Sequence, residues 1–335
     1  MGIEPPGSYY LIKMVRRKEL FRTTLVALVC LLLIALYQKN PSPLIRSRPA
    51  TFQAIQIEDD QPLEEHSLKE VIINAQRSRL RKELYDFKFP SNRPLANFAM
   101  EDGGQPIRTI IFSTWRSGST FLGDVLNALP GNYYHYEPLM DYGIIQIRGP
   151  PDADSALTRL KSLLNCDYTN LYKYIEYATT HNNLLRHNKR LWAHCEADHD
   201  ICWDREFLNQ FCRLFPFQSV KTVRLRLKLA EALLEVKSLN VKVILLIRDP
   251  RGTLQSRKHR DWCPGEPDCD QPNYLCSDMV SDYSAAIRLK ELYPSRFRAL
   301  RYEDICLNPY EIAEEVFNFI GITLHPQVIT MLVKS

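Results

Sequence analysis

This 335-residue sequence contains no lysine-rich tail, no internal repeat and no N-x-Ser/Thr glycosylation sequon. Because its formal net charge is only +4, the composition gives no support for nucleic-acid binding. The missing sequon means that N-glycosylation gives no evidence for a secretory location. Hydrophobic residues make up 45% of the chain, which is enough for one large domain or two small ones.

Charge is also absent from residues 23–37, near the N-terminus. With Leu20 and Phe21, and with Arg22 snorkelling outward, this stretch reaches about 17 residues, the lower limit for a membrane helix. Basic residues before a span keep that side cytoplasmic, and a short span suits the thin membranes of the early secretory pathway. We therefore predict a cytoplasmic tail (1–19), a transmembrane signal anchor (20–37) and a lumenal remainder. A cleaved signal peptide is the alternative, but no small-x-small site follows Leu36.

Nine cysteines are present, and one of them, Cys30, lies in the predicted span. The even number that remains indicates disulfides in an oxidising compartment, although the sequence does not determine their pairing. Cys263 and Cys269 flank the loop "CPGEPDC" and are candidates for a local bridge. A zinc site in "HCEADHDIC" (His194, Cys195, His199, Cys202) is the less favoured interpretation, because the CxxC pairs of common zinc modules are missing. We predict no metal site.

Residues 38–104 are polar, charged and interrupted by proline, which is typical of a stem. Within them, residues 68–87 are compatible with a helix that packs against a second copy, so a homodimer through the stem is one expectation. From residue 105 the pattern changes to strands alternating with helices. We predict strands over 109–114, 222–227 and 241–247 and within 296–305, and helices over 119–129, 228–239 and 310–321. This order predicts a three-layer α/β domain with a mostly parallel sheet.

Ligands of such sheets bind at the carboxyl ends of the strands, and the first candidate is the segment "RSGSTFL" (116–122). Gly118 permits a tight turn, the following helix presents backbone N–H groups, and Arg116 adds a fixed positive fork. Ser117, Ser119 and Thr120 add hydroxyl donors. Unlike the phosphate loop GxxxxGK[ST], the segment lacks the first glycine and has serine in the lysine position, so it predicts an anion site that needs no metal. A helix N-cap is the structural alternative.

The second candidate is "RDPRGTLQSR" (248–257), which directly follows the strand predicted over 241–247. Arg248 and Ser256 are suited to bind a second phosphate. The alternative is a surface turn in which Asp249 and Pro250 begin a helix.

Together the two segments resemble the paired signatures of Golgi sulfotransferases, and most closely the carbohydrate sulfotransferases that modify the 6-hydroxyl of galactose, N-acetylgalactosamine or N-acetylglucosamine. The motifs "YHYEPL" (134–139), "VKVILLIRDPRG" (241–252), "CSDMVSDYSAA" (276–286) and "FRALRYEDICLNP" (297–309) agree with that family. The resemblance covers residues 107–335. It implies a P-loop-containing sulfotransferase domain, 3′-phosphoadenylyl sulfate (PAPS) as donor, a glycan acceptor and a Golgi membrane location. It also implies that residues 116–122, including Phe121 and Leu122, bind the 5′-phosphosulfate, and that Arg248 and Ser256 bind the 3′-phosphate.

For chemistry, we expect Arg116 to support the leaving phosphate and Glu137 to act as the general base. His135 is the rival base, and a structural salt bridge is the alternative role for Glu137. Family members usually continue beyond the position of Ser335, so a non-catalytic lumenal PAPS- or glycan-binding protein is a second reading. A P-loop kinase is a third, although the loop lysine and a clear metal-binding acid are missing.

Overall fold

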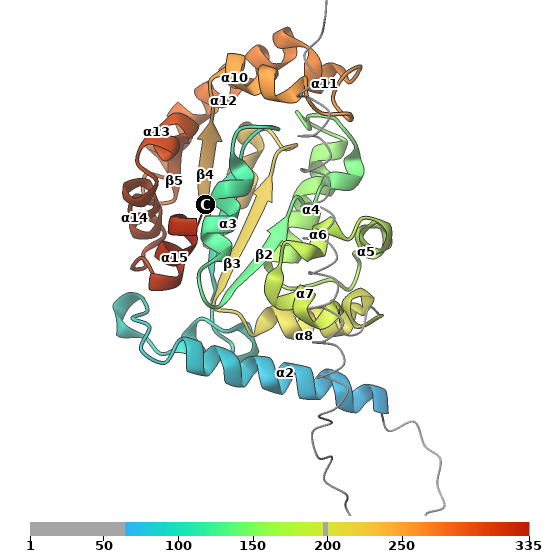
Figure 1. Ribbon diagram of the computed structural model, residues 1–335, viewed down its shortest axis with the longest axis vertical. Helices are drawn as coiled ribbons and strands as arrows, with labels where there is room; N and C mark the ends of the chain where they lie inside the picture. The colour runs from blue at the N-terminus through green and yellow to red at the C-terminus, as the bar shows by residue number, and fades with distance from the viewer. Residues whose placement is uncertain (1–63, 197–199, 335) are drawn as a thin grey trace, which may run out of the picture. The chain divides into compact units, whose positions relative to one another are not determined.

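The computed structural model describes residues 64–196 and 200–334, and these form one compact unit. At its centre is a five-stranded sheet in the order β2-β3-β1-β4-β5, in which every neighbouring pair is parallel (Figure 1). The predicted α/β fold with a parallel sheet is therefore confirmed. The strands are β1 (Ile107–Phe112), β2 (Asn132–Tyr136), β3 (Phe217–Thr222), β4 (Lys242–Ile247) and β5 (Phe297–Arg301).

Helices cover both faces of the sheet, as the contacts of neighbouring residues in β1 show. Ile111 belongs to a core cluster with side chains of α3, α8, α14 and α15, whereas Ile110 and Phe112 belong to a second cluster with side chains of α4, α9 and α12. Alternate side chains of a strand point to opposite faces, so the sheet is the middle of three layers. The helices are α2 (Glu64–Glu83), α3 (Ser119–Asn127), α4 (Asp152–Leu164), α5 (Tyr172–Thr180), α6 (Asn183–Arg186), α7 (Lys189–Cys195), α8 (Arg205–Arg213), α9 (Glu231–Leu234), α10 (Pro250–Arg257), α11 (Pro267–Asp270), α12 (Pro272–Leu292), α13 (Tyr302–Leu307), α14 (Pro309–Ile320) and α15 (Pro326–Lys334).

Most predicted elements are confirmed, but the strand expected over 222–227 is wrong. The strand is β3, which ends at Thr222, and all six of its residues are buried although several are polar. The alternation of Val223, Leu225 and Leu227 with arginines resembled a half-exposed strand. Both arginines are in fact buried and paired with carboxylates. The helix predicted over 228–239 is also too long, because only residues 227–234 are helical, as a 3-10 turn followed by α9.

Helix α2, which the sequence places in the stem, packs onto the same unit. Its residues Ile73 and Leu80 belong to the main core cluster. Just after it, Phe89 stacks on Phe217, the first residue of β3, with ring centroids 5.6 Å apart. The α2 segment therefore lies at the amino ends of the strands, at the bottom of the view in Figure 1. A dimer through the stem stays a prediction.

The predicted anchor, residues 20–37, lies outside the described residues. In the part of the chain that the structure describes, no helix is both long and apolar enough to cross a membrane.

Three disulfides link Cys166 to Cys212, Cys195 to Cys202 and Cys263 to Cys269. The local bridge expected between Cys263 and Cys269 is confirmed. The zinc interpretation is not supported, because two of its four ligands are joined in the Cys195–Cys202 bridge. Among residues 64–196 and 200–334, no group of three or more His, Cys, Asp and Glu side chains is arranged to hold a metal. Cys276 and Cys306 are exposed and carry no disulfide.

Candidate active site

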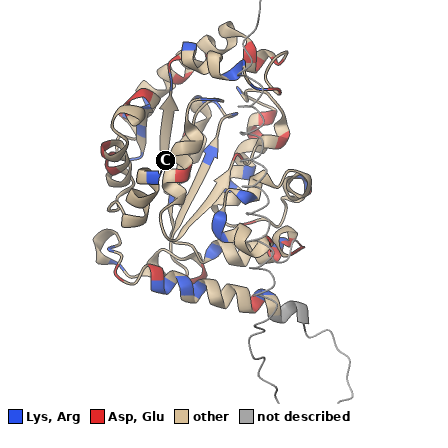
Figure 2. Ribbon diagram, viewed as in Figure 1, with Lys and Arg blue, Asp and Glu red and all other residues tan. Residues whose placement is uncertain are grey.

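A cavity of about 360 Å³ opens at the carboxyl ends of the strands. It combines four cations, one carboxylate and several aromatic rings, and Figure 2 shows basic residues on the loops at this edge of the sheet. A larger cavity of about 700 Å³ between α12 and strands β4 and β5 is lined mostly by apolar side chains and contains none of the predicted site residues. The smaller cavity is lined by Trp115, Arg116, Gly118, Ser119, Thr120, Tyr136, Glu137, Lys221, Val223, Arg248, Arg260, Trp262 and Tyr302.

The first predicted loop joins β1 to α3 and forms one side of this cavity. Gly118 has φ +83°, and a Cβ atom there would collide with the ring of Tyr302, so the turn requires glycine. No described side chain caps the first turn of α3, so the N-cap alternative is not supported and the N–H groups of this turn are available for an anion. Arg116 also has a positive φ of 67°, a strained conformation of the kind found at functional sites.

The side chains of this loop are not equivalent. Ser119 and Thr120 line the cavity. The Ser117 hydroxyl instead donates a hydrogen bond to the carbonyl of Thr114 (2.9 Å) and is fully buried. Leu122 belongs to the main core, and Phe121 packs against it. Of the predicted donor-binding residues, Ser117, Phe121 and Leu122 thus do not line the cavity.

The second predicted segment meets the first one directly. Arg248 donates a hydrogen bond from Nη1 to the carbonyl of Arg116 (2.9 Å), and its guanidinium lies 4.3 Å from the ring centre of Tyr302. Ser256 accepts a hydrogen bond from Arg116 Nε (3.0 Å). Burial, followed by the nearby Arg260 and Arg248, lowers the pKa of Arg116. Two turns that are about 130 residues apart in sequence therefore converge on one cation-rich cavity.

Glu137 lies just after β2, and both of its carboxylate oxygens are engaged. Oε1 pairs with Lys221 Nζ, and Oε2 accepts a hydrogen bond from Arg224 Nη1 (2.7 Å). Burial alone would raise the pKa of Glu137, but the two cations outweigh it and hold that pKa below the ordinary value of 4.5. Glu137 is thus an ionised carboxylate at the cavity wall. The salt bridge considered as its alternative role is present.

The sulfotransferase domain model matches residues 106–335, more than half of the chain. The chain belongs to the sulfotransferase family. It is 30% identical over 266 residues to carbohydrate sulfotransferase 1 of Danio rerio, covering 66% of this chain and 63% of the relative. It is 26% identical over 271 residues to carbohydrate sulfotransferase 5 of Mus musculus, covering 68% and 67%. The predicted kinship with the carbohydrate sulfotransferases is confirmed, although the chain spans only about 63% of the length of the first of these relatives.

Similarity to solved structures is weak. The sulfotransferase domain of the Synechococcus PCC 7002 olefin synthase has a TM-score of 0.39 and 18% identity, covering 67% of this chain and 76% of that one. A likeness of this size supports no conclusion about the site.

The cavity of this sulfotransferase family member also contains a lysine that was not predicted from the sequence. Lys221, in β3, is fully buried. Its Nζ lies 3.4 Å from Thr120 Oγ1 in the segment 116–122, which is called the anion loop below. The same ammonium lies 4.2 Å from the ring centre of Tyr136. The loop itself has no lysine, but the folded chain brings a lysine next to it from strand β3. Its only sequence signal was a lysine among buried residues of an unrecognised strand.

His135, the rival base, does not line the cavity. Its side chain is buried, and its ring centroid lies 5.0 Å from that of Tyr133 and 6.4 Å from that of Tyr168. Burial lowers the pKa of His135 to about 3. The structure places Glu137, not His135, next to the anion loop.

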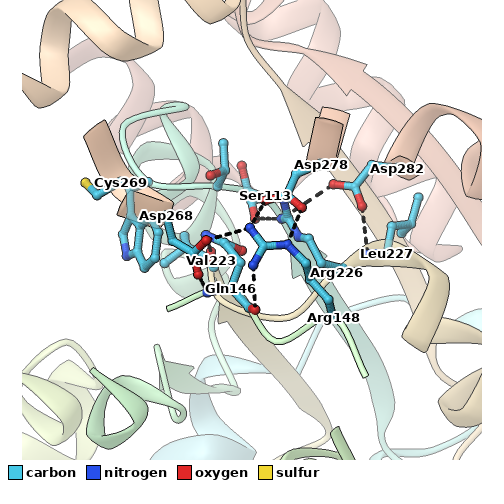
Figure 3. A network of polar contacts seen from close by, with 12 residues as sticks. Ser113, Gln146, Arg148, Val223, Arg226, Leu227, Asp268, Cys269, Asp278 and Asp282 are labelled. Carbon is cyan, nitrogen blue, oxygen red and sulfur yellow. Dashed lines mark hydrogen bonds and ion pairs between the residues drawn. The ribbon is translucent and has the colours of Figure 1, made fainter. Parts of the chain in front are cut away.

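A largely buried network of charges connects the segments around the cavity (Figure 3). Arg226 donates a hydrogen bond to the carbonyl of Ser113 (2.9 Å), just before the anion loop, and pairs with Asp278 and Asp282 of α12. Arg148 bridges Asp278 (2.8 Å) and Asp268 (2.6 Å). The loops after β1 and β3 are thereby tied to α11 and α12.

Proposed function

We propose that this protein transfers a sulfuryl group from PAPS to a hydroxyl of a glycan, the 6-hydroxyl of galactose, N-acetylgalactosamine or N-acetylglucosamine. The observation that carries the proposal is the convergence of Arg116 and Arg248 on one cavity that also contains Glu137. PAPS has a phosphosulfate and a separate 3′-phosphate, so its binding requires two anion sites at a fixed separation. The family membership and the named relatives agree with this chemistry.

In the proposed reaction, the acceptor hydroxyl oxygen forms a bond to sulfur while the bond from sulfur to the 5′-phosphate oxygen breaks. Glu137 receives the hydroxyl proton. The products are a sugar sulfate ester and adenosine 3′,5′-bisphosphate (PAP). Arg116, Lys221 and the N–H groups of α3 stabilise the negative charge that develops on the leaving phosphate. Holding donor and acceptor in line supplies a further part of the rate.

The kinase alternative is less consistent with the site. Asp249, the acid that follows β4, accepts a hydrogen bond from the backbone N–H of Arg251 (2.8 Å) and pairs with the Arg251 guanidinium. That carboxylate does not line the cavity. The non-catalytic alternative is decided by the assay below.

We also propose a type II protein of the Golgi membrane, with the sulfotransferase domain in the lumen. The three disulfides support an oxidising compartment.

The direct test is transfer of label. Full-length protein, purified in mild detergent, is incubated with sulfur-35-labelled PAPS and a panel of unsulfated glycans, including N-acetyllactosamine oligosaccharides and chondroitin. We expect label in at least one glycan, and linkage analysis of that product identifies the modified hydroxyl. Binding of PAP without transfer to any glycan would favour the non-catalytic alternative, and binding of ATP in preference to PAP would favour a kinase.

Replacing Arg248 by Ala should raise the donor KM by about 10- to 100-fold, because a charge-assisted hydrogen bond contributes about 1.5–3 kcal/mol. The matched control is Arg251→Ala in the first turn of α10, three residues further along, since Arg251 is 90% exposed and does not line the cavity. An unchanged donor KM for Arg248→Ala would place the 3′-phosphate elsewhere.

A further inference from the structure

The segment between α10 and α11 forms a separate wall of the cavity. Arg260 and Trp262 of this segment line it. Trp262 is 40% exposed, whereas Trp115 on the same wall is 5% exposed. A tryptophan that stays this exposed inside a polar, cation-rich cavity presents an apolar face for which a ligand is the natural partner.

Trp262 is held by a covalent anchor. The next residue is Cys263, which is bonded to Cys269, and both sulfurs are buried in a small cluster with Trp115 and Val223. The carbonyl of Cys269 accepts a hydrogen bond from Arg257 Nη1 (2.7 Å). This wall is thus fixed at its base even though it belongs to a loop.

The same arginine ties the wall to the anion loop. Arg257 is buried, and it also donates to Thr114 Oγ1 (2.6 Å) and to the carbonyl of Trp115 (3.1 Å). The position of Trp262 is therefore coupled to the loop that holds the donor. Arg257 acts as a positioning residue here, because its guanidinium is occupied by protein groups.

A continuous chain of contacts leads from Trp262 to the proposed base. The ring of Trp262 lies 6.2 Å from the ring of Trp115. The Trp115 ring has the Arg224 guanidinium 5.5 Å from its centre, and Arg224 binds Glu137. Trp262 and the carboxylate that is to receive the acceptor proton thus line the same cavity and are linked through Trp115 and Arg224.

Three of the four cations of the cavity, Arg116, Lys221 and Arg248, are already assigned to the phosphosulfate and the 3′-phosphate of the donor, and Arg260 is the fourth. The acceptor therefore needs a different kind of surface. Tyr136 is covered by the stacked His187 ring, with centroids 3.7 Å apart. Tyr302 lies against the Arg248 guanidinium. Trp262 is left as the exposed aromatic face.

We propose that Trp262 is the platform on which the acceptor sugar stacks, and that the Cys263–Cys269 bridge and Trp115 fix its position. The inference rests on the proposed function and specifies its acceptor site. The chemical class of ligand is a neutral hexopyranose, whose C–H face packs on the indole while its hydroxyls remain free for hydrogen bonds. Stacking on one face leaves the exocyclic hydroxyl at the ring edge, where Glu137 can take its proton.

The test compares Trp262→Ala and Trp262→Phe with wild type. The acceptor is whichever of the N-acetyllactosamine oligosaccharides or chondroitin is labelled by the wild-type protein. We expect the alanine variant to raise the acceptor KM by about three- to tenfold, the size of an aromatic contact, and to leave the donor KM unchanged. The phenylalanine variant should stay closer to wild type. Tyr283→Ala is the control, since Tyr283 is 67% exposed on α12 and lies outside this cavity.

Calorimetric titration of both glycans into the PAP-saturated protein separates the two proposals. Glycan binding that Trp262→Ala weakens, without any transfer by wild type, would overturn the proposed function and keep the platform. Transfer with an unchanged acceptor KM in Trp262→Ala would overturn the platform and keep the function. If Trp262→Ala raised the donor KM instead of the acceptor KM, Trp262 would contact PAPS rather than the glycan, and the platform would be overturned. Neither transfer nor binding with any glycan would overturn both.

Discussion

Replacing Glu137 by Gln should lower kcat by about 10²–10⁴, the usual contribution of a general base. Glutamine keeps the shape of the side chain but cannot accept the proton. The change also frees Lys221 and Arg224 from their common anion, so PAP, which is a polyanion, should bind at least as tightly as to wild type. The measurements are turnover with saturating PAPS and calorimetric titration of PAP.

Loss of the buried anion should also destabilise the fold, by about 3–5 kcal/mol if the two cations stay charged and unpaired. PAP binding distinguishes this effect from loss of chemistry. Glu101→Gln is the matched control, because Glu101 pairs with Arg77 on the surface, 2.7 Å apart and outside the cavity. Near-wild-type turnover of Glu137→Gln would remove Glu137 from the role of base.

The depressed pKa of Glu137 sets the sign of the pH dependence. The folded pKa lies below 4.5, so the carboxylate stays ionised at the mildly acidic pH of secretory compartments. The acid limb of kcat/KM should therefore fall below pH 4.5. The stability that this carboxylate contributes is present above its unfolded pKa and is lost as pH falls through the lower folded pKa.

Replacing Lys221 by Met should lower kcat by about 10²–10³, the effect of removing one preorganised charge from a transition-state site. Methionine matches the length of lysine without its charge, so the buried space next to Thr120 remains filled. Glu137 would keep only Arg224 as a partner, and its pKa should rise. Arginine should not restore activity, because a planar guanidinium does not replace a compact ammonium in a fully buried position.

The control for this change is Lys242→Met. Lys242 begins β4, which is separated from β3 by β1, and it donates from Nζ to the carbonyl of Phe319, at the opposite end of the sheet from the cavity. Wild-type kcat in Lys221→Met would mean that Arg116 and the backbone N–H groups of α3 are sufficient to stabilise the leaving phosphate. A rise in donor KM alone, with kcat unchanged, would make Lys221 a ground-state ligand.

The parts of the site that could be predicted from the sequence are short segments whose own residues indicate a turn at the end of a strand. Gly118 and Arg116 lie between an apolar strand and a helix, and Arg248 directly follows the most apolar strand. Such positions can be found from strand and helix periodicity alone, and the rule that ligands bind at the carboxyl ends of parallel strands brings them together.

The parts that were missed depend on contacts across the sheet. β3 is fully buried but contains Gln218, Ser219 and Lys221, so it has no apolar run to reveal it. Lys221 and Arg224 are tolerated in the interior because both pair with Glu137, which follows the neighbouring strand β2 and offsets part of their charge. No local pattern encodes that pairing. In the sequence, Trp262 is only one aromatic residue in a cysteine-rich loop. Its place in the cavity depends on the neighbouring Cys263–Cys269 disulfide and on Trp115, which the sequence does not reveal.

Helix α2 has a practical consequence for how the protein meets large substrates. The segment that follows α2 stacks on the first residue of β3, at the amino edge of the sheet, while the cavity opens at the carboxyl edge (Figure 1). Whatever is attached ahead of Glu64 is therefore joined to the pole opposite the cavity mouth. A bead fixed to the described unit at Glu64 should therefore leave the cavity mouth open to a long polymer.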